Sequence, residues 1–143
     1  MKVFLLSSAL AGILNFTLIS ATYADTDNIG TGSGITGVKQ INGEEIIKLA
    51  DNDEDMVTFD SRSAAQRKRG SLTWSEPFNA KTLTPKLLSE KVAENTTAIV
   101  FYGEPNSQEA AQGAKFAVKS GYKNVYWFKG GWDEWKQKKL TLK

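Results

Sequence analysis

The chain has 143 residues, of which 41% are hydrophobic and 24% charged, and it contains no cysteine and no histidine. This composition is that of one globular domain and argues against a disordered chain. The net charge of +2 is small and the basic residues are scattered, which excludes a typical nucleic-acid binder. The missing residue types also exclude disulfides, thiolate or imidazole metal ligands, a thiol nucleophile and the commonest general base.

The N-terminus has the features of a secretory signal peptide. Lys2 precedes a mostly apolar run over residues 3–19, and Ala24 ends a stretch suited to signal peptidase. We predict cleavage after Ala24, which makes residues 1–24 the signal peptide and the mature protein periplasmic or secreted. An uncleaved anchor helix is the alternative. On the first interpretation the chain meets a membrane only through the signal peptide, before cleavage.

Residues 25–36 are rich in Gly, Ser, Thr and Asp and are predicted to be a flexible linker. The folded domain is then expected over residues 37–143. Asn42 and Thr84 are expected N-caps, the second followed by Pro85 at the first helical position.

Strands and helices are predicted to alternate along the domain. In the first half we predict a helix after Asn42, a strand at 56–59, a helix at 63–67 and a possible strand at 72–74. In the second half we predict a helix from Pro85 with Leu87, Leu88 and Val92 on its apolar side, a strand at 98–102, a helix at 107–120, a strand at 124–128 and a helix at 132–138.

The run from Ala98 to Tyr102 is nearly continuous in apolar residues. Such a run is typical of a strand that is buried on both faces of a parallel sheet. Strands that alternate with helices predict an α/β domain with a mainly parallel central sheet flanked by helices.

Two motifs carry a resemblance to a known family. Residues 119–135 contain Gly-Tyr-x-Asn-Val followed by Gly-Gly-x-x-x-Trp, and residues 60–62 read Asp-Ser-Arg after a predicted strand. Both resemble motifs of the rhodanese-like domain family, and the resemblance covers roughly residues 36–139. The segment at residues 69–77 departs from the family pattern and lacks its histidine. The resemblance implies a single α/β domain of the rhodanese type.

The loop after the strand at 98–102 departs most from this family. An active rhodanese places there a cysteine that carries sulfur as a persulfide, whereas this chain has Gly103. Pro105 removes one backbone donor from the loop, and Glu104 adds negative charge. We therefore predict no catalytic residue, no metal site and no cofactor. The candidate ligand-binding residues, for a small anion, are Gly103, Glu104, Asn106, Ser107, Gln108, Arg62 and Trp132.

Each candidate also has a structural interpretation. Ser107 is expected to be the N-cap of the helix that follows, Asp60 to pair with Arg62 or with backbone donors, and Trp135 to pack in the core. Trp74 lies in an irregular segment and is expected to be exposed, where it marks a possible partner surface.

Three functions remain open at this point. The first is a catalytically degenerate rhodanese-like domain that acts as an exported binding or regulatory module for a small anion or an exported protein partner. The second is a sulfurtransferase that acts on thiosulfate without a protein persulfide. The third is a structural partner of an exported enzyme, docking through Trp74 or the basic C-terminal end.

Overall fold

The computed structural model describes residues 31–53 and 55–142. The predicted signal peptide and its cleavage after Ala24 lie outside these residues. The strands are β1 (Thr31–Gly32), β2 (Val38–Ile41), β3 (Val57–Asp60), β4 (Ser75–Pro77), β5 (Ile99–Tyr102) and β6 (Val125–Phe128). The helices are α1 (Gly43–Asn52), α2 (Ala64–Arg67), α3 (Pro85–Lys91), α4 (Gln108–Lys119) and α5 (Gly131–Gln137). None of the helices within the described ranges is long and apolar enough to cross a membrane.

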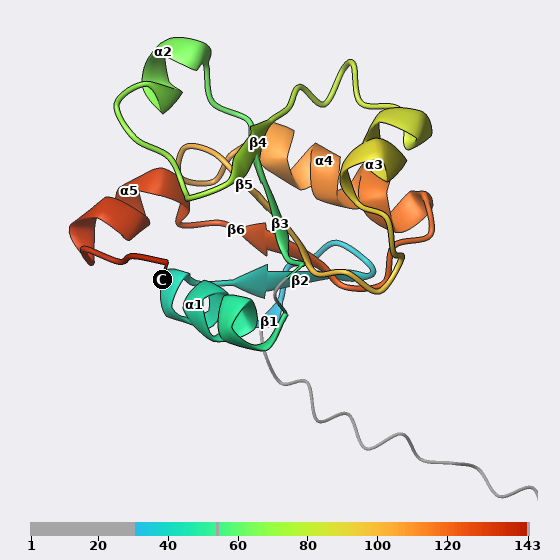
Figure 1. Cartoon of the computed structure of the whole chain (residues 1–143), viewed down its shortest axis with the longest axis horizontal. Helices are drawn as coiled ribbons and strands as arrows, with labels where there is room; N and C mark the ends of the chain where they lie inside the picture. Colours follow the sequence, from blue (N-terminus) through green and yellow to red (C-terminus); the bar gives the residue numbers. More distant parts are fainter. Residues whose placement is uncertain (1–30, 54, 143) are drawn as a thin grey trace, which may run out of the picture.

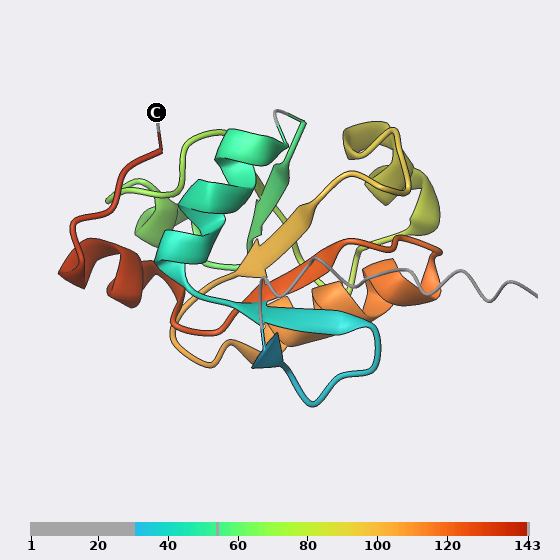
Figure 2. The same cartoon turned by 90° about the horizontal axis from the view of Figure 1, so that it is seen from below.

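The strands form one six-stranded sheet in the order β1-β2-β6-β5-β3-β4. The five strands from β2 to β4 in this order are parallel, and only β1 runs antiparallel to its neighbour. Helices cover both faces of the sheet, α3 and α4 on one side and α1 and α5 on the other (Figures 1 and 2). The prediction of an α/β fold with a mainly parallel sheet flanked by helices is therefore confirmed.

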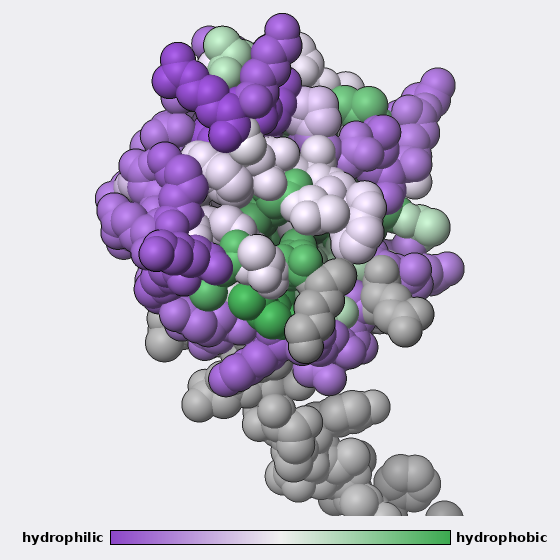
Figure 3. Space-filling view, turned by 60° about the vertical axis from the view of Figure 1, so that its left-hand side comes forward, coloured by the Kyte–Doolittle hydropathy of each residue, from purple (hydrophilic) through white to green (hydrophobic). Residues whose placement is uncertain are grey.

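Each central strand contributes to two separate cores. In β5, Ile99 and Phe101 pack against α3 and α4, whereas Val100 and Tyr102 pack on the side of α1 and α5. All four side chains are fully buried. The apolar run identified in the sequence is thus buried on both faces, as a central parallel strand requires. The outer surface is mostly hydrophilic on the face shown in Figure 3, where hydrophobic side chains gather at the floor of a hollow.

The helix starts follow the predicted capping residues. The Asn42 side chain accepts a hydrogen bond from the Glu45 N–H, and the Glu45 carboxylate accepts one from the Asn42 N–H, which completes a capping box. Thr84 caps α3 ahead of Pro85. The apolar side predicted for α3 was wrong at Leu87, which is 41% exposed, because the buried face follows Leu88 and Val92 four residues apart.

Three other boundaries differ from the predictions. The folded domain begins before residue 37, because the backbone of β1 pairs with β2 and this pairing needs no apolar side chain. Strand β2 was not predicted, because two polar residues separate its buried ends, Val38 and Ile41. The possible strand at 72–74 is instead a turn, in which Trp74 has a φ of 57°, and the strand follows at β4.

Candidate functional site

The register of the sheet brings three strand ends to one edge. Asp60 at the end of β3 lies beside Tyr102 at the end of β5, and Tyr102 lies beside Phe128 at the end of β6. The residues that follow these strands, Ser61 and Gly103 among them, therefore meet at the carboxyl edge. In open α/β sheets this edge is where ligands bind.

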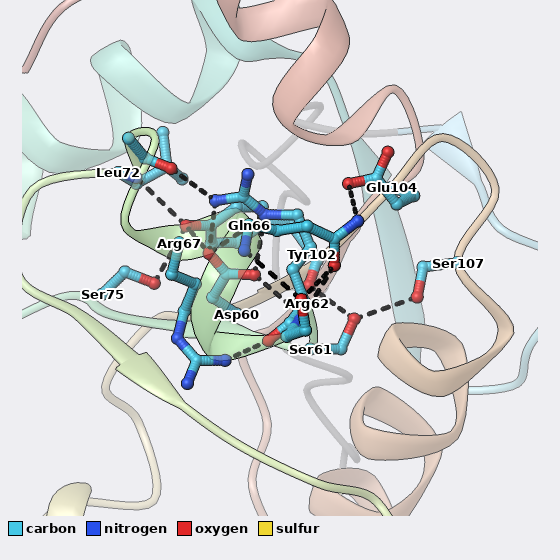
Figure 4. Close-up of polar contacts among 12 residues, drawn as sticks. Asp60, Ser61, Arg62, Gln66, Arg67, Leu72, Ser75, Tyr102, Glu104 and Ser107 are labelled. Carbon is cyan, nitrogen blue, oxygen red and sulfur yellow. Dashed lines mark hydrogen bonds and ion pairs between the residues drawn. The ribbon is translucent and has the colours of Figure 1, made fainter.

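A side chain on Gly103 would collide with two serine side chains unless they moved. A Cβ atom on Gly103 would lie 2.2 Å from the Ser61 Oγ and 2.8 Å from the Ser107 Oγ. The two hydroxyl oxygens are 3.0 Å apart, and the Ser61 hydroxyl also contacts the Tyr102 carbonyl oxygen at 3.1 Å. Figure 4 shows Ser61 and Ser107 facing each other beside α4. A pair of serine hydroxyls thus fills the position at which the resemblance places a cysteine side chain.

Two backbone donors of the loop between β5 and α4 form hydrogen bonds within the protein. The Asn106 N–H donates to the Lys129 carbonyl at 2.8 Å, and the Ser107 N–H donates to the Glu104 carbonyl at 3.0 Å. Pro105 has no N–H to offer. The Glu104 carboxylate accepts a hydrogen bond from the Gln66 amide at 3.2 Å. These two N–H groups therefore do not point at a ligand above the loop.

Ser107 is the N-cap of α4, as predicted. Its hydroxyl accepts a hydrogen bond from the Ala110 N–H at 3.2 Å, which satisfies one of the unpaired donors at the helix start. A serine nucleophile needs a base within hydrogen-bond reach, and the chain has no histidine. Besides the Ala110 N–H, the Ser107 hydroxyl contacts only the neutral hydroxyl of Ser61 among the described residues, so the geometry gives Ser107 a structural role.

The predicted pairing of Asp60 with Arg62 is confirmed, and the pair is buried. Arg62 Nη2 lies 2.6 Å from the Asp60 Oδ2, and Arg62 Nε lies 3.0 Å from Oδ1. Arg62 Nη2 also donates to the Gly70 carbonyl at 2.8 Å. Burial lowers the pKa of the Arg62 guanidinium, but Asp60 and Tyr102 together raise it by more, so this pKa lies above its ordinary value. Much of the hydrogen-bonding capacity of Arg62 is therefore committed inside the protein.

Aromatic side chains enclose the same guanidinium. The Trp132 ring lies 4.8 Å from the Arg62 guanidinium carbon, and the Tyr102 ring lies 5.7 Å from it. The Tyr102 hydroxyl lies 2.7 Å from the Asp60 carboxylate and accepts a hydrogen bond from the Leu72 N–H at 3.0 Å. Figure 4 shows Asp60, Arg62 and Tyr102 gathered into one polar group beneath the strand ends.

The structure thus divides the predicted ligand-binding residues into two groups. Gly103, Glu104, Asn106, Ser107 and Gln108 form the loop and the start of α4. Arg62 belongs to the buried polar group and also lines a cleft beside Ser61, and the half-buried Trp132 lies against its guanidinium. Their role in ligand binding stays a prediction. Trp135 packs in the core and Trp74 is 79% exposed, both as predicted, whereas docking through Trp74 also stays a prediction.

The buried Tyr102 makes stability depend on alkaline pH. Burial, followed by the nearby Asp60 charge, raises the pKa of Tyr102 from 10.0 to about 12. Below pH 10 the hydroxyl keeps its proton in both the folded and unfolded states. Between pH 10 and 12 only the unfolded state loses it, so the free energy of unfolding is expected to fall by about 2–3 kcal/mol through this group.

Urea unfolding at both ends of this pH range checks the expectation. The Tyr102→Phe variant is expected to be less stable than the wild type at pH 10. Between pH 10 and 12, however, its free energy of unfolding should fall by about 2–3 kcal/mol less than that of the wild type. An equal decline in the two proteins would show that Tyr102 does not govern the alkaline loss.

A cleft beside the serine pair contains residues that sequence reasoning missed. It has a volume of about 540 Å³, and its lining includes Ser61, Arg67, Asn79 and Glu109. Arg67 donates to the Arg62 carbonyl, and no carboxylate forms an ion pair with it among the residues that the structure describes. The sequence signal was the run of three basic residues at 67–69, which lay outside the family motifs.

The comparisons with known proteins agree with this geometry. Residues 42–138 match the family model described as rhodanese-like domain. The polysulfide-sulfur transferase homodimer of Wolinella succinogenes has a TM-score of 0.59 at 19% identity, over 73% of this chain and 77% of that one. A human single-domain sulfurtransferase has a TM-score of 0.55 at 15% identity, over 69% and 96% of the two chains.

A third structure, the As-Sb reductase of Leishmania major, has a TM-score of 0.55 at 26% identity, over 68% of this chain and 77% of that one. The search of curated proteins found no match. The family match spans more than half of the sequence, and the similar solved structures share its fold. The chain belongs to the rhodanese-like domain family.

Proposed function

We propose that this rhodanese-like domain has lost persulfide chemistry and acts as an exported binding module for a small oxyanion. One observation carries the proposal: the position that follows β5 is Gly103, and two serine hydroxyls fill the space that a side chain there would take. A persulfide needs a cysteine sulfur, and the chain has none. The loss therefore extends beyond one residue to the packing of the site.

A sulfurtransferase without a protein persulfide is the alternative in the enzyme class. In that reaction an acceptor would attack the outer sulfur of bound thiosulfate directly. The covalent intermediate that divides this reaction into two easier steps would be absent. The solved sulfurtransferases similar to this chain support its fold, at 15–19% identity, and leave the reaction to be tested.

The cleft next to Ser61 offers the best chemistry for an oxyanion. Arg67 supplies a guanidinium, which suits the oxygen pairs of sulfate-like groups. Ser61 and Asn79 supply neutral polar groups on the same lining. The Glu109 carboxylate also faces the cleft, but it accepts a hydrogen bond from the Ala80 N–H at 3.1 Å. These contacts favour an anion at Arg67 over one in the loop, whose donors at Asn106 and Ser107 are occupied.

Titration of the full mature chain with sulfate and thiosulfate, followed by the chemical shifts of its backbone amides, tests this proposal. Saturable shifts are expected around Ser61 and Arg67. Arg67→Gln should weaken binding by about tenfold or more, because it removes the charge from the hydrogen bond. The matched control is Lys68→Gln, on the exposed neighbour, which should leave the affinity within about twofold. Equal affinity in wild type and Arg67→Gln would refute an anion site at Arg67.

Export is a separate part of the proposal and rests on the sequence features of residues 1–24. The mature protein recovered from the exported fraction should begin at Asp25. Recovery of a chain that still begins at Met1 would instead favour the uncleaved anchor.

A further inference from the structure

A second cavity lies near the start of β3, away from the cleft at the strand ends. Its volume is about 220 Å³, and its lining comes from the second half of α1, from β3, from the turn before β4 and from the C-terminal segment. It shares no lining residue with the cleft that contains Ser61. Ile47, Met56 and Leu142 supply apolar walls.

Thr58 is the buried polar residue of this cavity. Its side chain is on the side of α1, since its partner in the adjacent strand, Val100, packs there. The residue is 2% exposed, and its hydroxyl has no hydrogen-bond partner among the described residues. A buried hydroxyl without a partner is destabilising, so such groups are normally paired. A ligand with a hydrogen-bonding group at its inner end would supply the missing partner.

The mouth of the cavity is negatively charged. Asp51 and Asp53 are the charged residues of its lining, and neither Lys nor Arg is part of it. Both acids lie at the C-terminal end of α1, whose last turn contains no basic residue. The carbonyl groups at a helix C-terminus add further negative potential. This end of the helix therefore favours a bound cation.

Trp74 stands beside the same mouth. The indole is 79% exposed, and the residue has a φ of 57°, which is costly for a bulky side chain. An aromatic face next to two carboxylates is a good environment for an ammonium group. The cavity is also smaller than the roughly 300–1,000 Å³ of drug-sized sites, which limits its occupant to a small molecule.

We propose that this cavity binds a small organic amine with an apolar body and a hydrogen-bonding group at its far end. The ammonium lies between Trp74 and the Asp51 carboxylate, since both oxygens of Asp53 already accept hydrogen bonds from the backbone N–H groups of Asp55 and Ala98. The apolar body fills the cavity, and the far end reaches the Thr58 hydroxyl. The proposal is independent of the oxyanion cleft, because the two sites share no residue.

Three related probes separate the parts of this proposal. Tyramine has the ammonium, the ring and a hydroxyl at the far end, phenethylamine lacks the hydroxyl, and 4-ethylphenol lacks the ammonium. On titration into the mature chain, tyramine is expected to give saturable chemical-shift changes at the Thr58 backbone amide and at the Trp74 indole N–H. Each of the other probes should bind about tenfold or more weakly, since each lacks one polar contact.

Variants locate the contacts. Thr58→Val keeps the shape of the side chain, and it should reduce tyramine affinity to that of phenethylamine while leaving phenethylamine binding unchanged. Asp51→Asn should weaken both amines and leave 4-ethylphenol unaffected. Thr96→Val, at an exposed threonine outside the cavity, is the matched control and should change nothing.

Three outcomes would overturn the proposal. The first is the absence of saturable shifts at Thr58 and Trp74 with millimolar tyramine. The second is equal binding of 4-ethylphenol and tyramine, which would remove recognition of the charge. The third is unchanged tyramine binding by Thr58→Val. A thermal unfolding midpoint for Thr58→Val no lower than that of the wild type ensures that the third result is not caused by misfolding.

Discussion

Arg62→Met is expected to destabilise the fold by about 3–5 kcal/mol, because it leaves the Asp60 carboxylate buried without its partner. Asp60 is fully buried, and Arg62 contacts both of its carboxylate oxygens. The Gly70 carbonyl loses its donor at the same time. The free energy of unfolding from urea titration of wild type and variant measures this effect.

Two further variants show whether the loss of stability comes from breaking the Asp60–Arg62 pair. Arg69→Met makes the same replacement at an exposed position on the same segment, and a change within about 0.5 kcal/mol is expected. In the Asp60→Asn, Arg62→Met double variant the buried charge is gone, so it should lose less than the sum of its two single variants. Strict additivity would show that the carboxylate and guanidinium do not stabilise each other.

Gly103→Cys, which restores the residue that the family's chemistry uses, is expected to destabilise the protein by about 2–4 kcal/mol. The new Cβ would lie 2.2 Å from the Ser61 Oγ and 3.0 Å from the Ser107 Cβ. Ser61 would have to rotate and give up its contacts with Tyr102 and Ser107. Urea unfolding under reducing conditions measures the cost.

A double-mutant cycle with Ser61→Ala tests this cause. The Ser61→Ala change removes the closest atom, so Gly103→Cys should be markedly less destabilising in that background than in the wild type. If the same destabilisation appears in both backgrounds, the serine pair does not block the position. The cycle thus separates a site closed by serines from one that merely lacks its cysteine.

Much of the fold was predictable because the signals were local. The apolar run of β5 and the capping residues Asn42, Thr84 and Ser107 each depend on neighbours in sequence. Strand β2 was missed because the two polar residues between Val38 and Ile41 leave no apolar run in the sequence. The positive φ of Trp74 was equally unpredictable, because bulky residues rarely adopt it.

In the candidate site too, contacts between sequence neighbours were predictable and long-range contacts were not. The pairing of Asp60 with Arg62 was predictable because the two residues are two positions apart in the sequence, at the end of one strand. The contact of Ser61 with Ser107 was not, since it joins residues 46 positions apart through the register of β3 and β5. The hydrogen bond from the Asn106 N–H to the Lys129 carbonyl is likewise a long-range contact that the sequence does not reveal. The sequence shows that the cysteine is absent, but it does not show that two serine hydroxyls lie where its side chain would be.

Transfer of sulfur from thiosulfate to cyanide, measured with the mature chain, tests the central claim most directly. We expect no rate above the uncatalysed reaction at any protein concentration, because no residue can carry the sulfur and Gly103 lies against the serine pair. A rate that saturates with thiosulfate and increases in proportion to the protein would contradict the claim and establish a sulfurtransferase that works without a protein persulfide.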